Sequence, residues 1–537
     1  MRTLVRLALV SASVFAFVSS AAPQNVSYER LLNADRTPQD WLMYGGNFAS
    51  QRYSRLKQID RTNVQNLKAA WIYQPAQPGM IEASPVVVDG IMYVTEPPST
   101  VTALDAKYGT KIWSWTPVLP QRVYTIGMHL ANRGIAILDS TIYVGTIDAH
   151  LVALDAKTGA VKWNVHIAEN NKGYAIESVP RIVNGKVIIG IGGGEAAARG
   201  FLDAYDAKTG ARVWRLWTVP APGEPGSETW GKDMTGTGGA TTWLTGSYDP
   251  ELNLLYWGTG NPGPDYNRDA RPGDNLYSCS LLAIDPDNGQ LKWYFQYTPH
   301  DTHDWDSSQA PVLFDDTLDG KPRKFVAMAN RNGFYYVLDR VTGQFVAGRP
   351  FVKVTWAKGL DEKGRPILAD NIEPTSAGQL VYPAVMGGTE WTGPSYSPET
   401  KLFYVSAHEM GAYFKAGRPR IDVNAPPNYG GGGQSALSGD DAYGAIRALD
   451  SLTGKLKWEY RLLAPAWVST LATAGGLVFS GSDEGDFFAL DAATGKLLWE
   501  FKISGTNPRT NPITYAVDGK QYVITESGNN FIAFSLP

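Results

Sequence analysis

Acidic and imidazole side chains crowd one short stretch of the chain, HDTHDWD at positions 300–306. The stretch contains Asp301, Asp304, Asp306, His300 and His303. Carboxylates this close repel one another unless they lie on a solvated loop or a cation sits among them. No further His or Cys pair accompanies the histidines, so we expect them to hydrogen-bond rather than to bind zinc. Asp301 is expected to be structural.

Oxygen ligands for a hard cation occur at two other places in the chain. Glu195 in IGGGEAAARG and Asn261 in WGTGNPGPD each follow an apolar run and lie among glycines. Glycine lets the backbone approach a ligand closely. Taken alone, Glu195 is better explained as a surface or loop acid and Asn261 as a turn residue.

A recurring segment indicates the elements that must position these residues. ALDAKTGAVKW at Ala153 returns, with variations, from Ala103, Ala204, Ala283, Val337, Ala448 and Ala489. The Asp can accept hydrogen bonds from backbone amides, and the Gly supplies the positive φ of a tight turn, so each copy predicts a β-hairpin. The Trp at the end of most copies is expected to pack between neighbouring units.

The spacing of these copies predicts a β-propeller. Successive starts are 50, 51, 79, 54, 111 and 41 residues apart, and propeller blades of four strands take about 40 to 50 residues. A worn copy, SYSPETKLFYV from Ser395, lies in the longest gap. We therefore predict an all-β, eight-bladed propeller, with residues 41–53 pairing with the last blade to close the ring. Function is expected in the irregular insertions at 218–240, 260–278, 298–309 and 409–444.

The start of the chain is typical of a secretory signal. Arg2 and Arg6 precede an apolar run at 7–18 and small residues at 19–22. The run is too short to span a membrane, although a membrane anchor with the same start is the alternative. We expect a signal peptide at 1–21, a periplasmic protein with no transmembrane segment, and one propeller domain at 22–537.

Composition restricts the chemistry further. The formal net charge of −4 gives no indication of nucleic-acid binding. The single cysteine, Cys279, cannot form an internal disulfide, and C-x-x-C-H does not occur, so this chain carries no c-type haem. Any redox chemistry therefore needs another carrier.

From Asp40 to the C-terminus the chain closely resembles the quinoprotein alcohol dehydrogenases, the methanol and ethanol dehydrogenase group that uses pyrroloquinoline quinone (PQQ). The stretches that carry the resemblance, in order, are IEASPVVVDGIMYV, NRGIAI, GGGEAAARG, GGATTWLTGSYDP, GTGNPGPD, RPGDN, TPHDTHDWD and NRNGFYYVLDR. The resemblance implies an eight-bladed propeller with PQQ in its axial funnel.

The resemblance also implies roles for individual residues. Glu195, Asn261 and Asp304 match the family's metal ligands, Asp304 also matches its proposed base, and Trp243 matches the indole on which the quinone stacks. Arg331 is expected to stabilise developing negative charge. Further contacts to PQQ are expected from Glu82, Arg133, Ser178, Gly194, Thr241, Arg331 and Trp391.

Asp306 predicts the kind of metal. In calcium-dependent relatives this second position is usually not an acid, whereas in lanthanide-dependent relatives it is Asp. A trivalent ion is better neutralised by one more carboxylate. We therefore hypothesise a lanthanide(III) ion in preference to Ca²⁺. The alternatives are that Asp306 points away or that Ca²⁺ binds with an extra ligand.

The chain departs from the family at three places. The vicinal Cys-Cys before NRG is replaced by Gly127, Met128 and His129. Glu177 and Glu390 replace a family Thr and Asn. Added carboxylates beside a polyanionic cofactor repel it unless they pair with a cation or are protonated.

Three functions are compatible with this sequence. The favoured one is a PQQ-dependent dehydrogenase of a primary alcohol, an aldehyde or a polyol, which passes electrons to a separate cytochrome c or similar acceptor. The second is a non-catalytic propeller scaffold like the outer-membrane assembly factors, and the third is a calcium-dependent lyase or hydrolase. Family members occur as monomers, as homodimers and with a small subunit, so a homodimer is one expectation.

Overall fold

The computed structural model describes residues 25–77, 79–123, 130–196, 198–231, 238–417, 430–439, 442–504 and 509–537. The expected signal peptide at 1–21 and the substituted positions Gly127, Met128 and His129 lie outside these ranges. Within them, no helix is long and apolar enough to cross a membrane.

Eight sheets of four or more strands make up most of the described chain. The first four, in pairing order, are β3 (Val86–Val88), β4 (Ile91–Glu96), β5 (Thr100–Asp105) and β6 (Lys111–Trp115); β7 (Ala136–Leu138), β8 (Thr141–Gly145), β9 (His150–Asp155) and β10 (Val161–His166); β11 (Arg181–Val183), β12 (Lys186–Gly190), β13 (Phe201–Asp206) and β14 (Arg212–Trp217); and β15 (Ser247–Asp249), β16 (Leu254–Gly258), β17 (Ser280–Ile284) and β18 (Leu291–Gln296). The other four are β19 (Val312–Leu318), β20 (Lys321–Ala329), β21 (Phe334–Asp339) and β22 (Phe345–Pro350); β26 (Ser395–Ser397), β27 (Leu402–Glu409), β30 (Tyr443–Asp450) and β31 (Leu456–Leu462); β1 (Tyr53–Ser54), β32 (Leu471–Thr473), β33 (Leu477–Gly481), β34 (Asp486–Asp491) and β35 (Leu497–Lys502); and β36 (Ile513–Val517), β37 (Lys520–Ser527), β38 (Asn530–Ser535) and β2 (Lys68–Tyr73).

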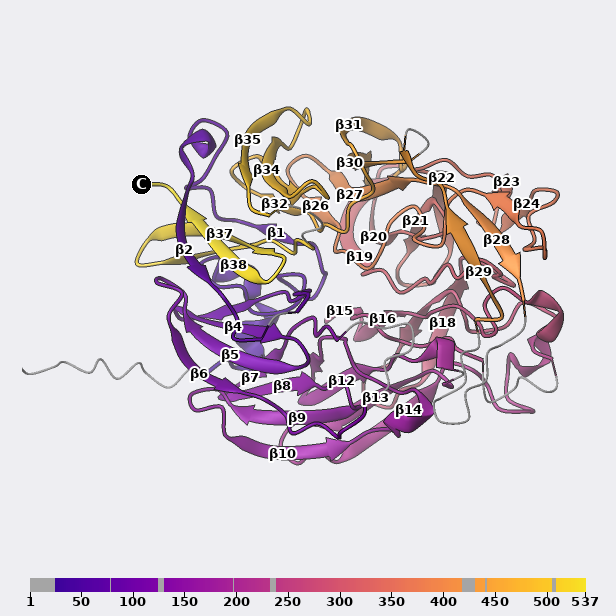
Figure 1. Ribbon diagram of the computed structural model, residues 1–537, viewed down its shortest axis with the longest axis horizontal. Helices are drawn as coiled ribbons and strands as arrows, with labels where there is room; N and C mark the ends of the chain where they lie inside the picture. Colours follow the sequence, from indigo (N-terminus) through magenta and orange to yellow (C-terminus); the bar gives the residue numbers. More distant parts are fainter. Residues whose placement is uncertain are drawn as a thin grey trace, which may run out of the picture.

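The sheets follow one another around a central axis, as Figure 1 shows. In the first sheet β3 is fully buried, whereas the residues of the fourth strand, β6, are exposed or half-buried. Apolar side chains of neighbouring sheets form shared clusters, one of which joins Val86, Tyr143, Ile188 and Leu255. The chain is therefore an all-β propeller.

Ring closure differs from the prediction for residues 41–53. The strand that joins the last sheet is β2 at 68–73, which pairs antiparallel with β38 and lies beside it in Figure 1. Tyr53 and Ser54 instead form β1, which pairs in parallel with β32 of the preceding sheet. The prediction was wrong because 41–53 is rich in turn-forming residues and contributes only this two-residue strand.

The insertions contain most of the remaining elements. Two small sheets, β23 (Ala357–Leu360) with β24 (Pro366–Leu368), and β25 (Gln379–Val381) with β28 (Ala412–Ala416) and β29 (Gly432–Ala436), lie outside the eight. Helical elements are short: α1 (Tyr28–Leu32), and the 3-10 turns η1 (Ala34–Arg36), η2 (Val64–Asn66), η3 (Asn170–Lys172), η4 (Gly194–Ala196), η5 (Ser227–Thr229) and η6 (Arg268–Ala270). The insertion at 351–394, between β22 and β26, was missing from the expected set.

The recurring hairpins have the predicted local chemistry. In the second sheet the Asp155 carboxylate accepts hydrogen bonds from the Lys157 and Thr158 amides at 3.1 Å, and Gly159 has a φ of +73°. A Cβ atom on Gly159 would lie 2.7 Å from the Trp113 ring of the preceding sheet. The repeated tryptophans donate Nε1–H to a carbonyl of the next sheet's hairpin: Trp71 to Ala106, Trp113 to Ala156, Trp163 to Ala207, Trp214 to Pro286, Trp293 to Val341 and Trp458 to Ala492.

This packing predicts different costs for two glycine substitutions with the same backbone conformation. Gly185 has a φ of +72° with nothing within 4 Å of its Cβ position. Gly185→Ala should lower the free energy of unfolding by about 1–2 kcal/mol, because only the left-handed backbone conformation opposes the alanine. Gly159→Ala should cost about 1–3 kcal/mol more, because the methyl group collides with Trp113. Urea unfolding of both variants measures the difference, and equal costs would show that the tryptophan contact does not matter.

Candidate active site

Residues far apart in the sequence reach one site because each stands the same number of positions before the start of a strand. Six side chains each stand four positions before the first residue of β3, β11, β15, β26, β32 or β36: Glu82 before Val86, Glu177 before Arg181, Trp243 before Ser247, Trp391 before Ser395, Trp467 before Leu471 and Arg509 before Ile513. Because the innermost strands surround one axis, equal offsets deliver these side chains to the same end of the axis. The repeat therefore builds the site.

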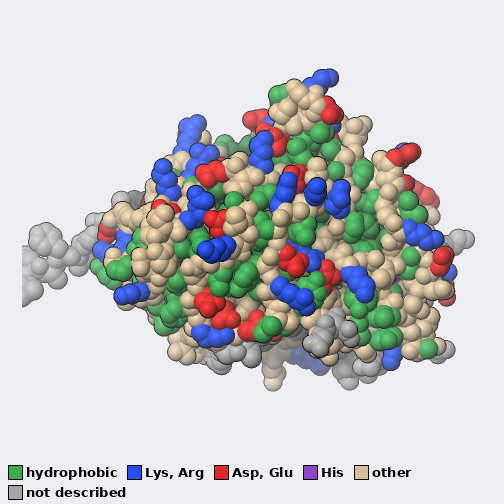
Figure 2. All heavy atoms as spheres, turned by 90° about the horizontal axis from the view of Figure 1, so that it is seen from above, with side chains coloured by type: hydrophobic (Ala, Val, Ile, Leu, Met, Phe, Trp, Pro, Cys, Tyr) green, Lys and Arg blue, Asp and Glu red, His purple; other side chains and the backbone are tan. Residues whose placement is uncertain are grey.

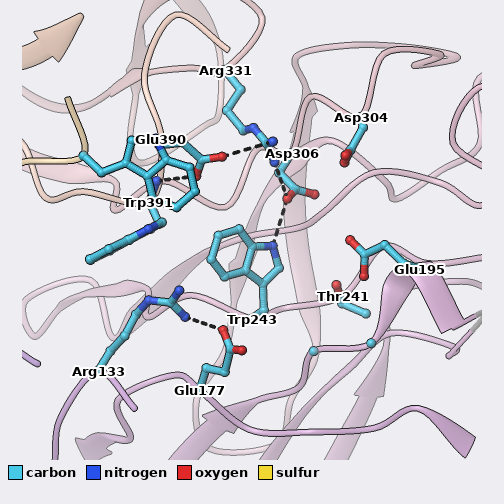
Figure 3. A pocket seen from close by; sticks show the side chains of 13 residues that line it. Arg133, Glu177, Glu195, Thr241, Trp243, Asp304, Asp306, Arg331, Glu390 and Trp391 are labelled. Carbon is cyan, nitrogen blue, oxygen red and sulfur yellow. Dashed lines mark hydrogen bonds and ion pairs between the residues drawn. The ribbon is translucent and has the colours of Figure 1, made fainter. Parts of the chain in front are cut away.

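A cavity of about 130 Å³ lies among these segments. Its lining residues are Arg133, Glu177, Gly192, Gly193, Glu195, Thr241, Trp243, Asp304, Asp306, Arg331, Glu390, Trp391 and Trp467. Figure 3 shows the labelled residues around it, with the carboxylates of Glu195 and Asp304 turned toward one another beside Trp243. Charged groups and flat aromatic rings thus share one enclosed space.

Asp306 organises the centre of the cavity. Its Oδ2 accepts hydrogen bonds from Trp243 Nε1 at 3.0 Å and from Arg331 Nη1 at 2.7 Å, and its Oδ1 accepts one from the Asn261 amide at 2.6 Å. A Cβ on Gly260 would lie 2.6 Å from Asp306 Oδ1, so glycine is needed there. Asp306 points into the cavity and fixes both the indole and the guanidinium.

Four carboxyl groups interact electrostatically around this centre: the buried Asp265 and Asp306 and the half-buried Glu195 and Asp304. Burial, and then repulsion from Asp306, raise the pKa of Glu195 to about 7. Burial also raises the pKa of Asp304 well above its ordinary value, while Arg331 opposes the shift and the other three acids reinforce it. Asp265 has a similarly raised pKa, caused by burial and then by Glu195. The excess of acids over cations disfavours ionisation of Glu195, Asp265 and Asp304.

Asp304 combines this environment with an unusual backbone. Its φ is +62°, in the left-handed region that few residues other than glycine adopt. Its Oδ1 is buried and has no hydrogen-bond partner. Strained backbone of this kind is concentrated at functional sites.

A second charged network lies on the other side of the indole. Arg133 forms ion pairs of 2.7 Å with both Glu82 and Glu177, and Arg509 also pairs with Glu82. The Arg133 guanidinium carbon is 5.1 Å from the Trp243 ring centroid and 4.7 Å from that of Trp391. Glu390 pairs with Arg331 at 3.1 Å. Glu177 and Glu390, the two acids that differ from the family pattern, therefore each have an arginine partner.

The residues fit an aromatic polyanion and a hard cation. Five buried polar atoms at the cavity have no partner: Arg133 Nε, Glu177 Oε1, Asp304 Oδ1, Arg331 Nε and Trp391 Nε1. Such atoms are costly unless a ligand satisfies them. The oxygen donors suit a hard cation. In the described residues, however, no three His, Cys, Asp or Glu groups are arranged to hold a metal by themselves.

The rest of the HDTHDWD stretch is structural. Asp301 accepts hydrogen bonds from the amides of His303 at 3.3 Å and Trp305 at 3.1 Å, as expected of a structural acid. His303 stacks on Trp305 with centroids 4.3 Å apart, and its Nε2 lies 2.9 Å from the Ile372 carbonyl oxygen. His300 Nδ1 contacts the Gly273 carbonyl oxygen. Both histidines hydrogen-bond to backbone, as predicted.

Most residues expected at the site lie together. Eight of them line the cavity: Arg133, Glu195, Thr241, Trp243, Asp304, Asp306, Arg331 and Trp391. Glu82 and Asn261 bond to lining residues, and the Cβ position of Gly194 is 3.5 Å from Thr241 Oγ1. Ser178 is buried and donates its hydroxyl to the Gly190 carbonyl at 3.4 Å, away from the lining.

Sequence reasoning missed three residues of the site: Asp265, Trp467 and Arg509. Asp265 accepts a hydrogen bond from Asn261 Nδ2 at 2.9 Å and lies in the same GTGNPGPD stretch. Arg509 lies over the Trp467 ring, 3.9 Å from its centroid. The four-residue offset before the innermost strands could have located Trp467 and Arg509.

Comparison with known proteins agrees with this geometry. Residues 41–357, more than half of the chain, match the model of the glucose/ethanol/alcohol dehydrogenase β-propeller domain, and residues 442–536 match that of the outer membrane protein assembly factor BamB. Quinoprotein alcohol dehydrogenase PedH of Pseudomonas putida is 39% identical over 98% of this chain and 92% of its own length. The lanthanide-dependent methanol dehydrogenase of Methylacidiphilum fumariolicum is 37% identical over 93% and 86%, respectively.

Solved structures support the same relationship. A europium-containing methanol dehydrogenase superposes with a TM-score of 0.89 at 33% identity, covering 95% of this chain and 100% of its own. The quinohemoprotein alcohol dehydrogenase ADHIIG of Pseudomonas putida HK5 gives 0.87 at 36% identity, covering 96% and 83%, respectively. From its sequence, fold and site, the chain belongs to the glucose/ethanol/alcohol dehydrogenase β-propeller family.

Proposed function

We propose that this protein is a PQQ-dependent alcohol dehydrogenase of the periplasm that oxidises a primary alcohol, with an aldehyde or a polyol as the alternative substrate. A separate cytochrome c receives the electrons, because no haem motif occurs in the chain. The observation that carries the proposal is the cavity in which Trp243 lies beside clustered carboxylates. One of these carboxylates belongs to Asp304, whose Oδ1 is buried and has no hydrogen-bond partner. The eight sheets serve as eight blades held together by their tryptophan contacts.

Trp243 provides the platform for the cofactor. Its indole is fixed by the hydrogen bond to Asp306, and a flat ring system gains by stacking on it. Arg133, Arg331 and Thr241 supply donors for carboxylates and carbonyls. When bound, PQQ supplies a two-electron acceptor and the metal supplies Lewis-acid charge.

Asp304 takes the hydroxyl proton of the alcohol. Its carboxylate lies at the cavity, as Figure 3 shows, and its Oδ1 is buried without a hydrogen-bond partner. A base must be ionised, and a cation held by Glu195, Asn261, Asp304 and Asp306 would lower the raised pKa of Asp304. Arg331, held by Asp306 and Glu390, stabilises negative charge as it develops.

A lanthanide(III) ion is the metal we favour over Ca²⁺. A carboxylate offers about four acceptor positions, and Asp306 uses three of them for Asn261, Trp243 and Arg331. One position is left for a cation. Higher ionic charge offsets more of the repulsion among the four clustered acids.

A propeller scaffold is the less favoured alternative. The match to BamB covers 442–536, whereas Glu195, Trp243, Asp304 and Arg331 all lie within the dehydrogenase match at 41–357. A scaffold has no use for buried, mutually repelling carboxylates, which cost stability.

Dye-linked alcohol oxidation by the purified protein with PQQ, with LaCl₃ or CaCl₂ in parallel, tests the proposal. We expect activity from the wild type and a loss of about 10²–10⁴-fold in kcat in Asp304→Asn, because the amide cannot accept the proton. PQQ binding, followed by absorbance, should persist in the variant. Absence of both activity and PQQ binding in the wild type would favour the scaffold.

Asp306→Ala tests the choice of metal by a binding measurement. Tb³⁺ bound beside Trp243 should show tryptophan-sensitised luminescence. In Asp306→Ala the dissociation constant for Tb³⁺ should rise at least tenfold, and that for Ca²⁺, measured by competition with Tb³⁺, should rise less. Asp269→Ala, which removes an acid whose side chain is 92% exposed, is the matched control. Equal weakening for both ions in Asp306→Ala would contradict the preference for a lanthanide.

A further inference from the structure

A second, larger cavity adjoins the candidate active site. Its volume is about 660 Å³, within the range of small-molecule sites. Its apolar wall comes from Met386, Met410, Leu437, Leu463 and Pro465, and Trp467 lines this cavity as well as the first one. The two spaces therefore meet at one indole.

The walls of this second cavity are tied to the catalytic arginine. The Gly388 amide donates to the Arg331 carbonyl at 2.8 Å, and Arg331 Nη2 donates to the Val385 carbonyl at 2.7 Å, on either side of Met386. The Ala384 amide donates to the Met410 carbonyl at 2.8 Å. The segment that supports Arg331 thus also forms the apolar wall.

The cavity has an inner and an outer end. At the inner end Arg509 lies against the Trp467 ring and is engaged by Glu82. At the outer end Leu463 is 82% exposed. Its other polar lining residues are Ser438 and the half-buried Asp483. The methionines are flexible and polarizable, and such side chains adapt to ligands of varied shape.

Another cavity of about 660 Å³ shares no lining residue with the candidate active site. On the face drawn in Figure 2, basic and acidic side chains are interspersed among apolar ones. An apolar cavity that opens to solvent and shares a wall with a redox site suits the part of a substrate that does not react.

We propose that this cavity receives the apolar tail of the alcohol, and that Met386, Met410 and Leu437 make the enzyme select alcohols with apolar chains over equally long polar ones. The inference rests on the proposed dehydrogenase function and adds its substrate class. The hydroxyl end reaches Asp304 past Trp467, while the chain stays among the methionine and leucine side chains.

Two substrates of equal size test the selection. In 1-hexanol and 1,5-pentanediol a methyl group exchanges with a hydroxyl group, which would lose its water in the apolar cavity. We expect kcat/KM for 1-hexanol to exceed that for 1,5-pentanediol at least tenfold. Met410→Gln and Leu437→Asn, which keep side-chain size but add polarity, should reduce this ratio to about two- to threefold. Leu456→Gln, on the outermost strand β31 at 48% exposure, should leave it unchanged.

A binding measurement without cofactor or metal separates this inference from the proposed function. The ¹⁹F NMR line of 6,6,6-trifluoro-1-hexanol should broaden with the wild type and with Leu456→Gln, and broaden less with Met410→Gln and Leu437→Asn. Turnover of both alcohols at a ratio that neither cavity variant changes would overturn the role of the cavity and leave the dehydrogenase standing. No turnover of any alcohol by the wild type would overturn both.

Discussion

Mutual repulsion among clustered carboxylates is the constraint on which this structure depends. Glu195, Asp265, Asp304 and Asp306 lie within one another's field. Arg331 is the neighbouring cation of Glu195, Asp304 and Asp306, and Arg271 is that of Asp265. Isolated buried charge is expensive, and proteins retain it where function requires it. The same acids are the oxygen donors that a hard cation prefers. The repulsion that lowers stability without a metal therefore favours binding of a cation.

The repeated sheet makes such an arrangement possible. In six sheets the fourth residue before β3, β11, β15, β26, β32 or β36 either lines the cavity or belongs to the ion-pair network of Arg133 and Glu82. The insertions then supply what the repeat cannot: the left-handed turn at Asp304 and the apolar wall that includes Met410. The rigid ring positions the acids, and the irregular segments determine what reaches them.

Much of this could be predicted from the sequence, and the limits have physical causes. Asp–Gly hairpins ending in Trp are local signals, so the strands and their repeat were recovered. Ring closure was misplaced because the pairing of β2 with β38 joins segments more than 450 residues apart, and no local pattern reports it. The resemblance located Trp243, Asp304 and Arg331. Trp467 and Arg509 were missed because their place depends on the exact start of β32 and β36. The partners of Glu177 and Glu390 needed coordinates, since a residue type alone does not say which arginine lies beside it.

The most direct measurement is anomalous X-ray diffraction from crystals of the protein grown with PQQ and LaCl₃. The account predicts one strong lanthanum peak bonded to oxygens of Glu195, Asn261, Asp304 and Asp306, with the quinone stacked on Trp243. A lanthanum peak elsewhere, or a cavity in which the four side chains remain apart around an ordered quinone with no metal, would contradict it.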